Sequence, residues 1–196
     1  MGFEIEYEEG QTPIAEEEKL GLKLPLTTQS DLDQVEQANI EKALIWLMKH
    51  KVTPEKALSE AFLKKLHQKM FGEEWKWAGK FRQSEKNIGV KWIMVGRDVK
   101  VLCDDTLFWV ENETFPPKEI ALRFKHRLVS IHCFPNGNGR HSRIMADVLM
   151  EKIFSQEPFS WRAGGMISAS EERSMYIAAL RKADQGDFTD LLAFGN

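Results

Sequence analysis

One short segment, residues 132–143, holds the residue types that a transfer reaction would need. It reads His-Cys-Phe-Pro-Asn-Gly-Asn-Gly-Arg-His-Ser-Arg. His132 is a candidate general base, because an imidazole titrates near neutral pH. Gly137 and Gly139 allow close backbone approach to a ligand, and Arg140 and Arg143 are bidentate donors that suit phosphate. The segment therefore predicts a phosphate site with a histidine at its mouth, which suits phosphotransfer or nucleotidyl transfer.

Apolar residues at helical spacing flank this segment on both sides. One pattern runs up to it from Ile120 to Ile131, and the other leaves it through Ile144, Met145, Val148, Leu149 and Ile153. We expect a polar loop between two buried helices. The second helix would offer free N–H groups and the positive end of its dipole to an anion. Two arginines in its first turns are unfavourable beside that dipole unless an anion is bound.

A simple turn is the alternative interpretation of the same residues. Pro, Asn and Gly dominate turns, so residues 135–139 could join two helices without binding anything. A plain turn needs no pair of arginines, however, and this favours a binding site. The other histidines have no comparable surroundings, are interpreted as structural or surface residues, and show no zinc-ligand spacing: His50, His67, His126 and His141.

The segment also resembles the signature of the Fic/Doc family, which has His, any residue, Phe, any residue, an acid, Gly-Asn-Gly-Arg, two residues and Arg. The matching residues, in order, are His132, Phe134, Gly137, Asn138, Gly139, Arg140 and Arg143. Two positions depart from the pattern: Asn136 replaces the acid, and Cys133 replaces the proline that is frequent after the histidine. Residues 77–82 and 183–192 are also similar to family stretches, the former to the one that precedes its flap. The layout is similar to the small bacterial "mobile mystery protein B" branch, where asparagine at the acid position is usual.

The resemblance implies a protein AMP-transferase, a nucleotidyltransferase that moves AMP from ATP to a Ser, Thr or Tyr hydroxyl of a target protein. His132 would be the catalytic base, and the nucleotide and its phosphates would be bound by Gly137, Asn138, Gly139, Arg140 and Arg143. The acid of the family helps to hold Mg²⁺, and Asn136 would be a weaker ligand because Mg²⁺ prefers charged oxygens. Two alternatives stay open. One is an impaired Fic-fold module that binds nucleotide or protein, and the other is a transferase that uses another phosphate-containing donor.

The expected fold is a mainly α-helical bundle with one β-hairpin and the active loop between two central helices. Alternating residues around Gly96-Arg97-Asp98 predict the hairpin over residues 90–102. By resemblance it is the flap on which a target segment adds as an extra strand, and the docking residues are Trp92, Ile93 and Met94. Residues 1–29 are expected to form an N-terminal arm and residues 30–196 a Fic-like domain, with helix starts at Ser30 and Thr53.

The resemblance also predicts a restraint on activity. Many family members carry a helical glutamate that pairs with the second arginine of the signature. Glu36 is the nearest candidate here, although Leu32 stands four residues earlier, where Ser or Thr is usual. The alternative is a solvated carboxylate on a helix face, which is the usual environment of a glutamate.

Composition narrows the class of protein. The chain has 196 residues, 42% of them hydrophobic and 29% charged, as in a soluble globular domain. The net charge of −3 disfavours a nucleic-acid surface, and no apolar run is long enough for a membrane span. The acidic residues 1–10 do not read as a signal peptide, and Cys103 and Cys133 are expected as free thiols in a reducing cytoplasm. The identity of a target, and whether there is an antitoxin partner, are not visible in the sequence.

Overall fold

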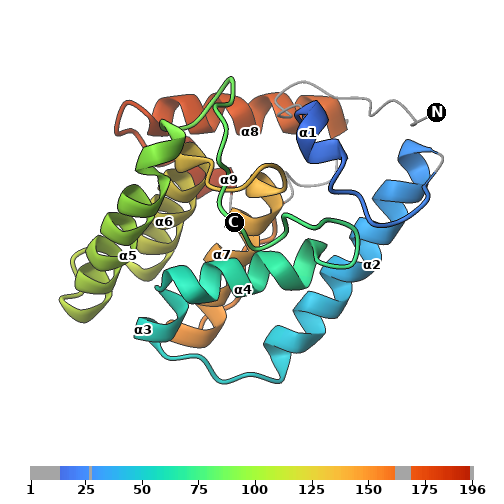
Figure 1. Ribbon diagram of the computed structural model, residues 1–196. Coiled ribbons are helices and arrows are strands. Elements are labelled where there is room, and N and C mark those ends of the chain that lie inside the picture. The colour runs from blue at the N-terminus through green and yellow to red at the C-terminus, as the bar shows by residue number, and fades with distance from the viewer. Residues whose placement is uncertain (1–13, 27, 162–168, 195–196) are drawn as a thin grey trace.

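A computed structural model describes residues 14–26, 28–161 and 169–194 (Figure 1). This part of the chain is helical; its bridge between Leu22 and Trp75 belongs to no strand. The helices, with η1 a 3₁₀ turn and η2 a π turn, are α1 (Glu16–Lys19), α2 (Gln29–Met48), α3 (Pro54–Ala57), α4 (Glu60–Phe71), η1 (Trp92–Met94), α5 (Val95–Glu111), α6 (Pro117–Ile131), α7 (Asn138–Val148), η2 (Leu149–Ile153), α8 (Ala169–Ala183) and α9 (Thr189–Phe194). The prediction of a mainly helical fold is confirmed.

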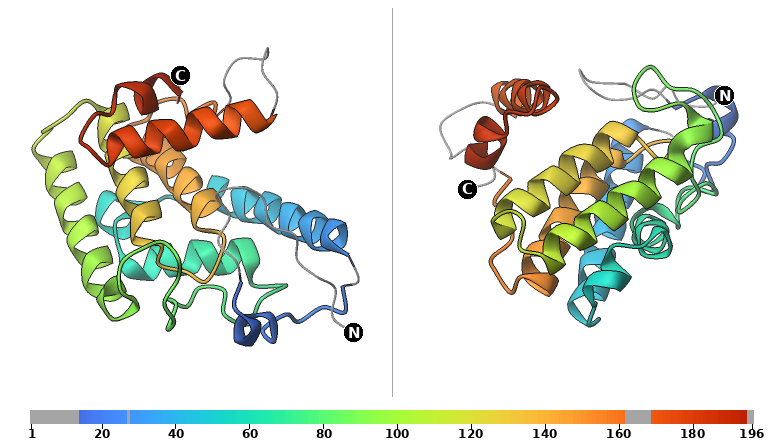
Figure 2. Two further views of the ribbon diagram at one scale, coloured as in Figure 1. Left: turned by 90° about the horizontal axis from the view of Figure 1, so that it is seen from above. Right: turned by 90° about the vertical axis from the view of Figure 1, so that its left-hand side faces the viewer.

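The centre of the molecule is the pair α6 and α7. Helix α6 packs against α5 on one side and α7 on the other, and α4 packs against α2 and also contacts α5 and α7. Figure 2 shows α5 and α6 running side by side, with α8 and α9 beyond their ends. Loop 132–137 joins α6 to α7, so the polar segment lies between two central helices, as predicted. Apolar faces on both helices explain this burial: Ile120, Leu128 and Ile131 on α6 and Met145 and Val148 on α7 are buried.

The predicted β-hairpin at residues 90–102 is wrong. Residues 92–94 form η1, and α5 begins at Val95. The buried face of α5 includes Val95, Val99, Leu102, Cys103 and Thr106, a spacing of three or four residues that is typical of a helix. Alternation extends over only a few residues before Gly96, and this glycine lies inside the helix instead of in a turn. The longer helical pattern therefore determines the structure.

The N-cap of α2 lies two residues before the predicted one, and the buried face of this helix includes polar side chains. Its N-cap is Thr28, not Ser30: the Asp31 N–H donates to Thr28 Oγ1 at 3.1 Å, and the Thr28 N–H donates to the Asp31 carboxylate at 3.0 Å. Leu44 of α2 is 42% exposed. The buried residues of α2 are Leu32, Glu36, Asn39, Ala43 and Leu47. Two polar side chains of α2 are therefore inside the molecule.

Residues 14–26 pack on the segment that follows α4. The Lys23 N–H donates to the Glu74 carbonyl at 2.7 Å, and the Lys76 N–H donates to the Gly21 carbonyl at 2.8 Å. Ile14 is buried in the core. The described half of the predicted arm is therefore docked, and its first 13 residues lie outside the described part. None of the described helices is long and apolar enough to cross a bilayer.

Candidate active site

The loop between α6 and α7 is fixed by its own backbone. His132 ends α6 in the left-handed region, with φ 54° and ψ 58°, and Gly137 precedes α7 with φ 77°. The Asn138 side chain closes the loop from inside: its Oδ1 accepts from the Phe134 N–H at 2.9 Å, and its Nδ2 donates to the Phe134 carbonyl at 2.8 Å. Because this side chain points inward, only the backbone of Asn138 is available to a ligand.

The start of α7 is open to an anion. Among the described residues no side chain caps it, and its first turn has no acidic residue. A Cβ on Gly139 would have no neighbour within 4 Å, so this side of the turn is unobstructed. A Cβ on Gly137 would lie 2.5 Å from the Phe71 ring, so glycine is required there for space as well as for its backbone angle. The first N–H groups of α7 can therefore bind an anion, as helix N-termini do.

Phe134 and two histidines anchor the loop to α4. Phe134 is fully buried and stacks on His67 with 3.7 Å between ring centroids. His67 Nε2 contacts the Asn136 carbonyl at 3.1 Å, and His141 Nε2 contacts the Leu63 carbonyl at 3.1 Å. Burial lowers the pKa of His141 to about 4 and that of His67 well below its usual value. Both are structural histidines, consistent with the interpretation from the sequence.

The side chain of His132 differs from these two. It is 5% exposed, and neither ring nitrogen has a hydrogen-bond partner within the described residues. Burial, and then the charges of Arg82 and Lys86, lower the pKa of His132 to about 4. The imidazole is therefore uncharged at neutral pH and carries a lone pair to which no described residue donates a hydrogen bond.

A loop of residues 82–90, called the cover loop below, lies over His132. The Arg82 N–H donates to the Cys133 carbonyl at 2.9 Å, and the Val90 N–H donates to the Ile131 carbonyl at 3.3 Å. A Cβ on Gly89, where φ is 102°, would lie 2.7 Å from His132 Cβ. This loop, and not the predicted hairpin, is the segment beside the candidate base. The sequence indicated this loop through residues 77–82, which resemble the family stretch that precedes the flap.

The two arginines of the loop point in different directions. Arg140 Nη1 lies 2.5 Å from the Glu36 carboxylate, which also accepts from the Trp75 indole N–H at 3.0 Å. The guanidinium of Arg143 lies 4.6 Å from the Tyr176 ring of α8, and its Nε has no partner among the described residues. Glu36 therefore contacts the first arginine, whereas the resemblance predicted a contact with the second.

Comparison with known proteins identifies the family. The sequence model described as the Fic/DOC family matches residues 57–150, which include the whole segment from His132 to Arg143. Residues 57–150 of the chain belong to the Fic/DOC family. Residues 132–143 are accordingly called the Fic loop below.

Curated relatives and solved structures agree with this assignment. The proteins named "Protein adenylyltransferase Fic" from Drosophila mojavensis and Drosophila melanogaster are 28% and 29% identical over 121 residues, which is 59% of this chain and 22% and 23% of theirs. The chain thus spans less than a quarter of these relatives.

The fold is similar to that of the N-terminal FIC domain of Bep8 from Bartonella sp. 1-1C, with a TM-score of 0.68, 17% identity and coverage of 89% of this chain and 87% of that one. It is also similar to BepC from Bartonella tribocorum with bound AMPPNP, with a TM-score of 0.66, 16% identity and coverage of 88% of each chain.

A cluster that the sequence interpretation missed lies beside Arg143. Lys125 of α6 is fully buried, donates to the Tyr176 hydroxyl and lies 4.2 Å from the Tyr176 ring. Burial, and then the charge of Arg143, lower the pKa of Lys125 well below its usual value. Asp147 accepts from the Trp161 indole, and burial raises its pKa to about 6. Lys125 stands seven residues before His132, a helical spacing that could have indicated a shared face.

The Fic loop does not form a metal site by itself. Asn136 Oδ1 accepts from the Gly137 N–H at 2.5 Å, so this uncharged oxygen already has a partner. In the part of the chain that the structure describes, no three His, Cys, Asp or Glu residues lie close enough to hold a metal ion together. These residues do not fit a protein-held Mg²⁺, which prefers carboxylate oxygens.

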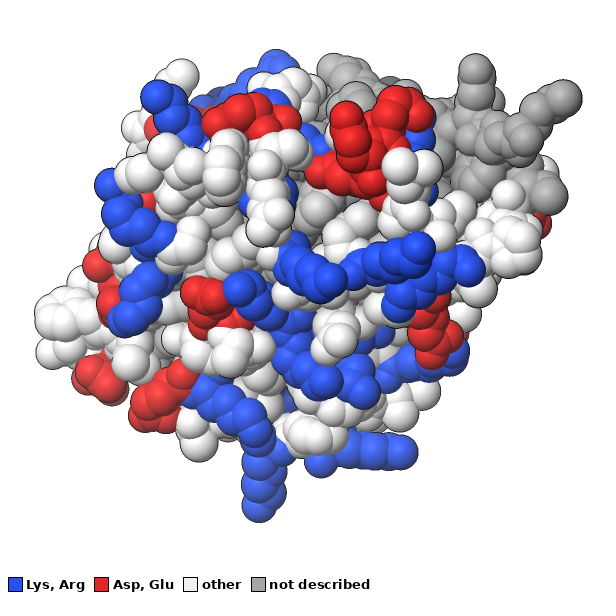
Figure 3. Space-filling model, in the orientation of Figure 1, with Lys and Arg blue, Asp and Glu red and all other residues white. Residues whose placement is uncertain are grey.

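Two of the three expected docking residues, Trp92 and Ile93, line a groove beside the cover loop, whereas Met94 does not border it. Trp92 and Ile93 are 41% and 65% exposed, and with Lys64, Phe81 and Arg82 they border a cavity of about 380 Å³. Figure 3 shows Lys and Arg side chains across the middle of this face, over α4 and the loop after it. The exposed lysines of that region include Lys65, Lys69, Lys76 and Lys80.

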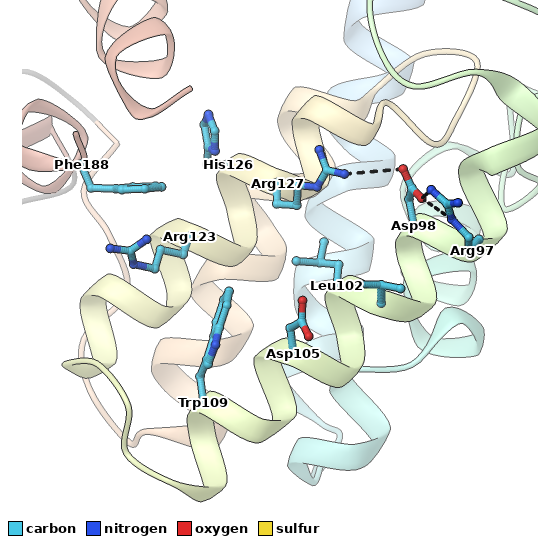
Figure 4. Close-up of a pocket in the computed structure, with 10 residues that line it drawn as sticks. Arg97, Asp98, Leu102, Asp105, Trp109, Arg123, His126, Arg127 and Phe188 are labelled. Atoms are coloured by element: carbon cyan, nitrogen blue, oxygen red, sulfur yellow. Dashed lines mark hydrogen bonds and ion pairs between the residues drawn. The ribbon is translucent and has the colours of Figure 1, made fainter. Parts of the chain in front are cut away.

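A second cavity, of about 450 Å³, lies away from the Fic loop. It is bordered by α5, α6 and Phe188 (Figure 4). Asp98 pairs with Arg97 at 2.8 Å and with Arg127 at 3.5 Å, and Arg123 pairs with Glu119 at 2.6 Å. Its arginines are therefore already bound to carboxylates, and it contains none of the predicted site residues.

Proposed function

We propose that this protein is a protein adenylyltransferase, which moves AMP from ATP to a Ser, Thr or Tyr hydroxyl of a target protein. The observation that carries the proposal is the buried, uncharged and unpaired imidazole of His132, one short loop before the uncapped start of α7. The names of the curated relatives support the reaction class, and the AMPPNP bound to BepC supports ATP as the donor.

In the proposed reaction His132 accepts the hydroxyl proton of the target on one ring nitrogen. The hydroxyl oxygen attacks the α-phosphorus of ATP, the bond from this phosphorus to the bridging oxygen breaks, and pyrophosphate leaves. The N–H groups at the start of α7 stabilise the phosphate charge. Arg143 binds the terminal phosphates, and Arg140 steadies the loop or the phosphates.

The low pKa of His132 fits this role once nucleotide is bound. A base near pKa 4 is weak, and general bases act best near the working pH. A triphosphate brings negative charge close to the imidazole, and a nearby opposite charge favours the protonated form. Nucleotide binding would therefore raise the pKa of His132 toward neutrality.

The target would dock beside the cover loop. Since residues 92–102 are helical, they cannot pair with a target as an extra strand. The exposed side chains of Trp92 and Ile93 instead border a groove that also includes Arg82. Arg82 contacts the backbone of His132, so a segment bound there would lie near the base.

A second candidate function is a Fic-fold module that binds nucleotide without transferring it. Asn136 favours this reading, because it carries no charge where the family signature has an acid. Release of pyrophosphate from ATP distinguishes the two functions. A different phosphate-containing donor would be revealed by the mass added to the modified protein.

The deciding experiment is the intact mass of the purified protein after incubation with ATP and Mg²⁺, beside a His132→Ala variant. We expect one added AMP in the wild type and none in the variant, a loss of at least ~100-fold in rate. A Glu36→Gly variant and a cell lysate as target source serve as further arms. If all of them remain unmodified, the adenylyltransferase proposal is wrong and the binding module is the better reading.

A further inference from the structure

Arg82 is a buried arginine that contacts the Fic loop and both ends of the cover loop. It is 2% exposed. Its Nε donates to the His132 carbonyl at 2.6 Å, its Nη1 donates to the Ser84 carbonyl at 2.8 Å, and its Nη2 donates to the Val90 carbonyl. The backbone N–H of Arg82 donates to the Cys133 carbonyl at 2.9 Å. One side chain therefore joins the beginning of the cover loop, the end of that loop and the candidate base.

Arg82 contacts His132 where the backbone is strained, because His132 adopts left-handed φ and ψ angles. The left-handed region is unfavourable for a non-glycine residue, so surrounding contacts must hold His132 there. Past the end of α6, the His132 carbonyl accepts from the Arg82 guanidinium, a charge-assisted bond. The direction of the imidazole follows from this backbone turn, because side-chain direction depends on φ and ψ.

We propose that Arg82 is the positioning residue of the candidate base: it holds the left-handed turn that carries the His132 ring and ties the cover loop across it. This inference depends on the proposed function only for the role of His132 as base. Lysine could not replace Arg82 fully, because a single ammonium lacks the planar fork that reaches several carbonyls at once.

The charge of Arg82 acts on the same ring. Among the described residues, the charged groups that lower the pKa of His132 are Arg82 and Lys86, both of which disfavour its protonation. Lys86 forms an ion pair with Glu18 of α1. The carboxylate paired with Arg82 is that of Glu85, which lies 3.9 Å away and is 61% exposed. Arg82 is therefore the less neutralised of the two cations, and its removal would make His132 easier to protonate.

The test compares Arg82→Gln, which removes the charge and most donors, with Arg82→Lys, which retains the charge. The matched control is Arg127→Gln, a half-exposed arginine on α6 that is paired with Asp98. Histidine NMR titration follows His132, assigned with His132→Ala, and amide hydrogen exchange follows residues 82–90. In Arg82→Gln we expect His132 to titrate about one pH unit higher and the Val90 amide to exchange at least ~10-fold faster. In Arg82→Lys we expect the faster exchange with a smaller titration shift.

Unchanged titration in Arg82→Gln together with unchanged exchange in Arg82→Lys would overturn the proposal, as would equal effects in the Arg127→Gln control. If Arg82→Gln does not fold, exchange in Arg82→Lys decides alone. These measurements need no catalysis, so they remain decisive even if the wild type transfers no AMP. If it does transfer AMP, Arg82→Lys should lower kcat with little change in the KM for ATP.

Discussion

Glu36 joins the Fic loop to a helix more than a hundred residues earlier in the chain. Its carboxylate binds Arg140 at 2.5 Å and the Trp75 indole at 3.0 Å, although the Arg140 side chain is 42% exposed. Such a contact would compete with a phosphate for the Arg140 guanidinium. Glu36 is therefore a candidate restraint that acts through the first arginine of the signature.

Replacing Glu36 by Gln keeps an acceptor for Trp75 and removes the charge that holds Arg140. We expect ATP to bind roughly tenfold more tightly, because Arg140 becomes free to reach the phosphates. The measurement is calorimetric titration with ATP. The control is Glu41→Gln, an exposed glutamate on the same helix. Unchanged or weaker binding would show that Glu36 only supports the fold.

Replacing Asn136 by Asp tests the missing charge of the Fic loop. The carboxylate could still accept from the Gly137 N–H, as the amide oxygen does at 2.5 Å, and would add a ligand that Mg²⁺ prefers. We expect the Mg²⁺ concentration for half-maximal pyrophosphate release to fall by about tenfold. An identical metal dependence in both proteins would mean that position 136 does not contribute to metal binding.

At the scale of elements, the start of α7 depends on two glycines with different surroundings. Gly137→Ala would place a Cβ 2.5 Å from the Phe71 ring at a φ of 77°, and we expect a loss of roughly 2 kcal/mol or more in the free energy of unfolding. In Gly139→Ala the new methyl group meets no atom within 4 Å, so we expect the free energy of unfolding to rise by up to about 1 kcal/mol. The same methyl group should obstruct phosphate binding. Chemical denaturation and ATP titration check both, and equal stability of the two variants would contradict this account.

The groove between η1, α4 and the cover loop is the second element with a testable role. The double substitution Trp92→Ala with Ile93→Ser removes two side chains that are 41% and 65% exposed. We expect target modification to fall by about tenfold or more, because exposed aromatic and aliphatic anchors dominate docking, while ATP affinity is unchanged. Phe108→Ser is the control, since Phe108 is 58% exposed on α5 but does not border the groove. An equal loss in the control would remove the groove from the docking model.

At the scale of the whole molecule, buried histidines make stability depend on pH. His132 and His141 have pKa values of about 4 in the folded protein, against 6.5 when unperturbed, because they are buried. As pH falls below 6.5, the unfolded chain takes up these protons first. Their contribution to stability is therefore complete above pH 6.5 and is lost as pH falls toward 4.

We expect the free energy of unfolding to fall by about 2 kcal/mol or more between pH 7 and pH 4.5, which lowers Tm by roughly 4–8 °C. Calorimetry at several pH values measures this loss. A His141→Gln variant should show a shallower pH dependence, whereas exposed His50→Gln should follow the wild type. A Tm that stays constant down to pH 4.5 would contradict the buried, uncharged state of these rings.

The prediction of a helix was correct where the apolar pattern is long. The prediction of a hairpin at residues 90–102 was wrong because it depended on a short alternating pattern. Helix α6 spans Pro117–Ile131 and includes the whole apolar pattern from Ile120 to Ile131 from which the sequence predicted a helix. The alternation before Gly96 was too short to be diagnostic, and the helical spacing of α5 beyond it determined the structure. Glu36 illustrates a different failure: its burial depends on Trp75 and Arg140, which approach α2 only in the folded chain.

The sequence by itself determined the Fic loop, the two helices around it and the family, because these features depend on residues that are close together in the chain. Only the tertiary structure decided what covers His132, what holds Arg140 and where Arg143 points. The deciding contacts join residues far apart: Arg82 to His132 across 50 positions and Glu36 to Arg140 across 104. Such contacts leave no periodic pattern in a sequence, since they are selected by packing between helices and not by the preferences of neighbouring residues.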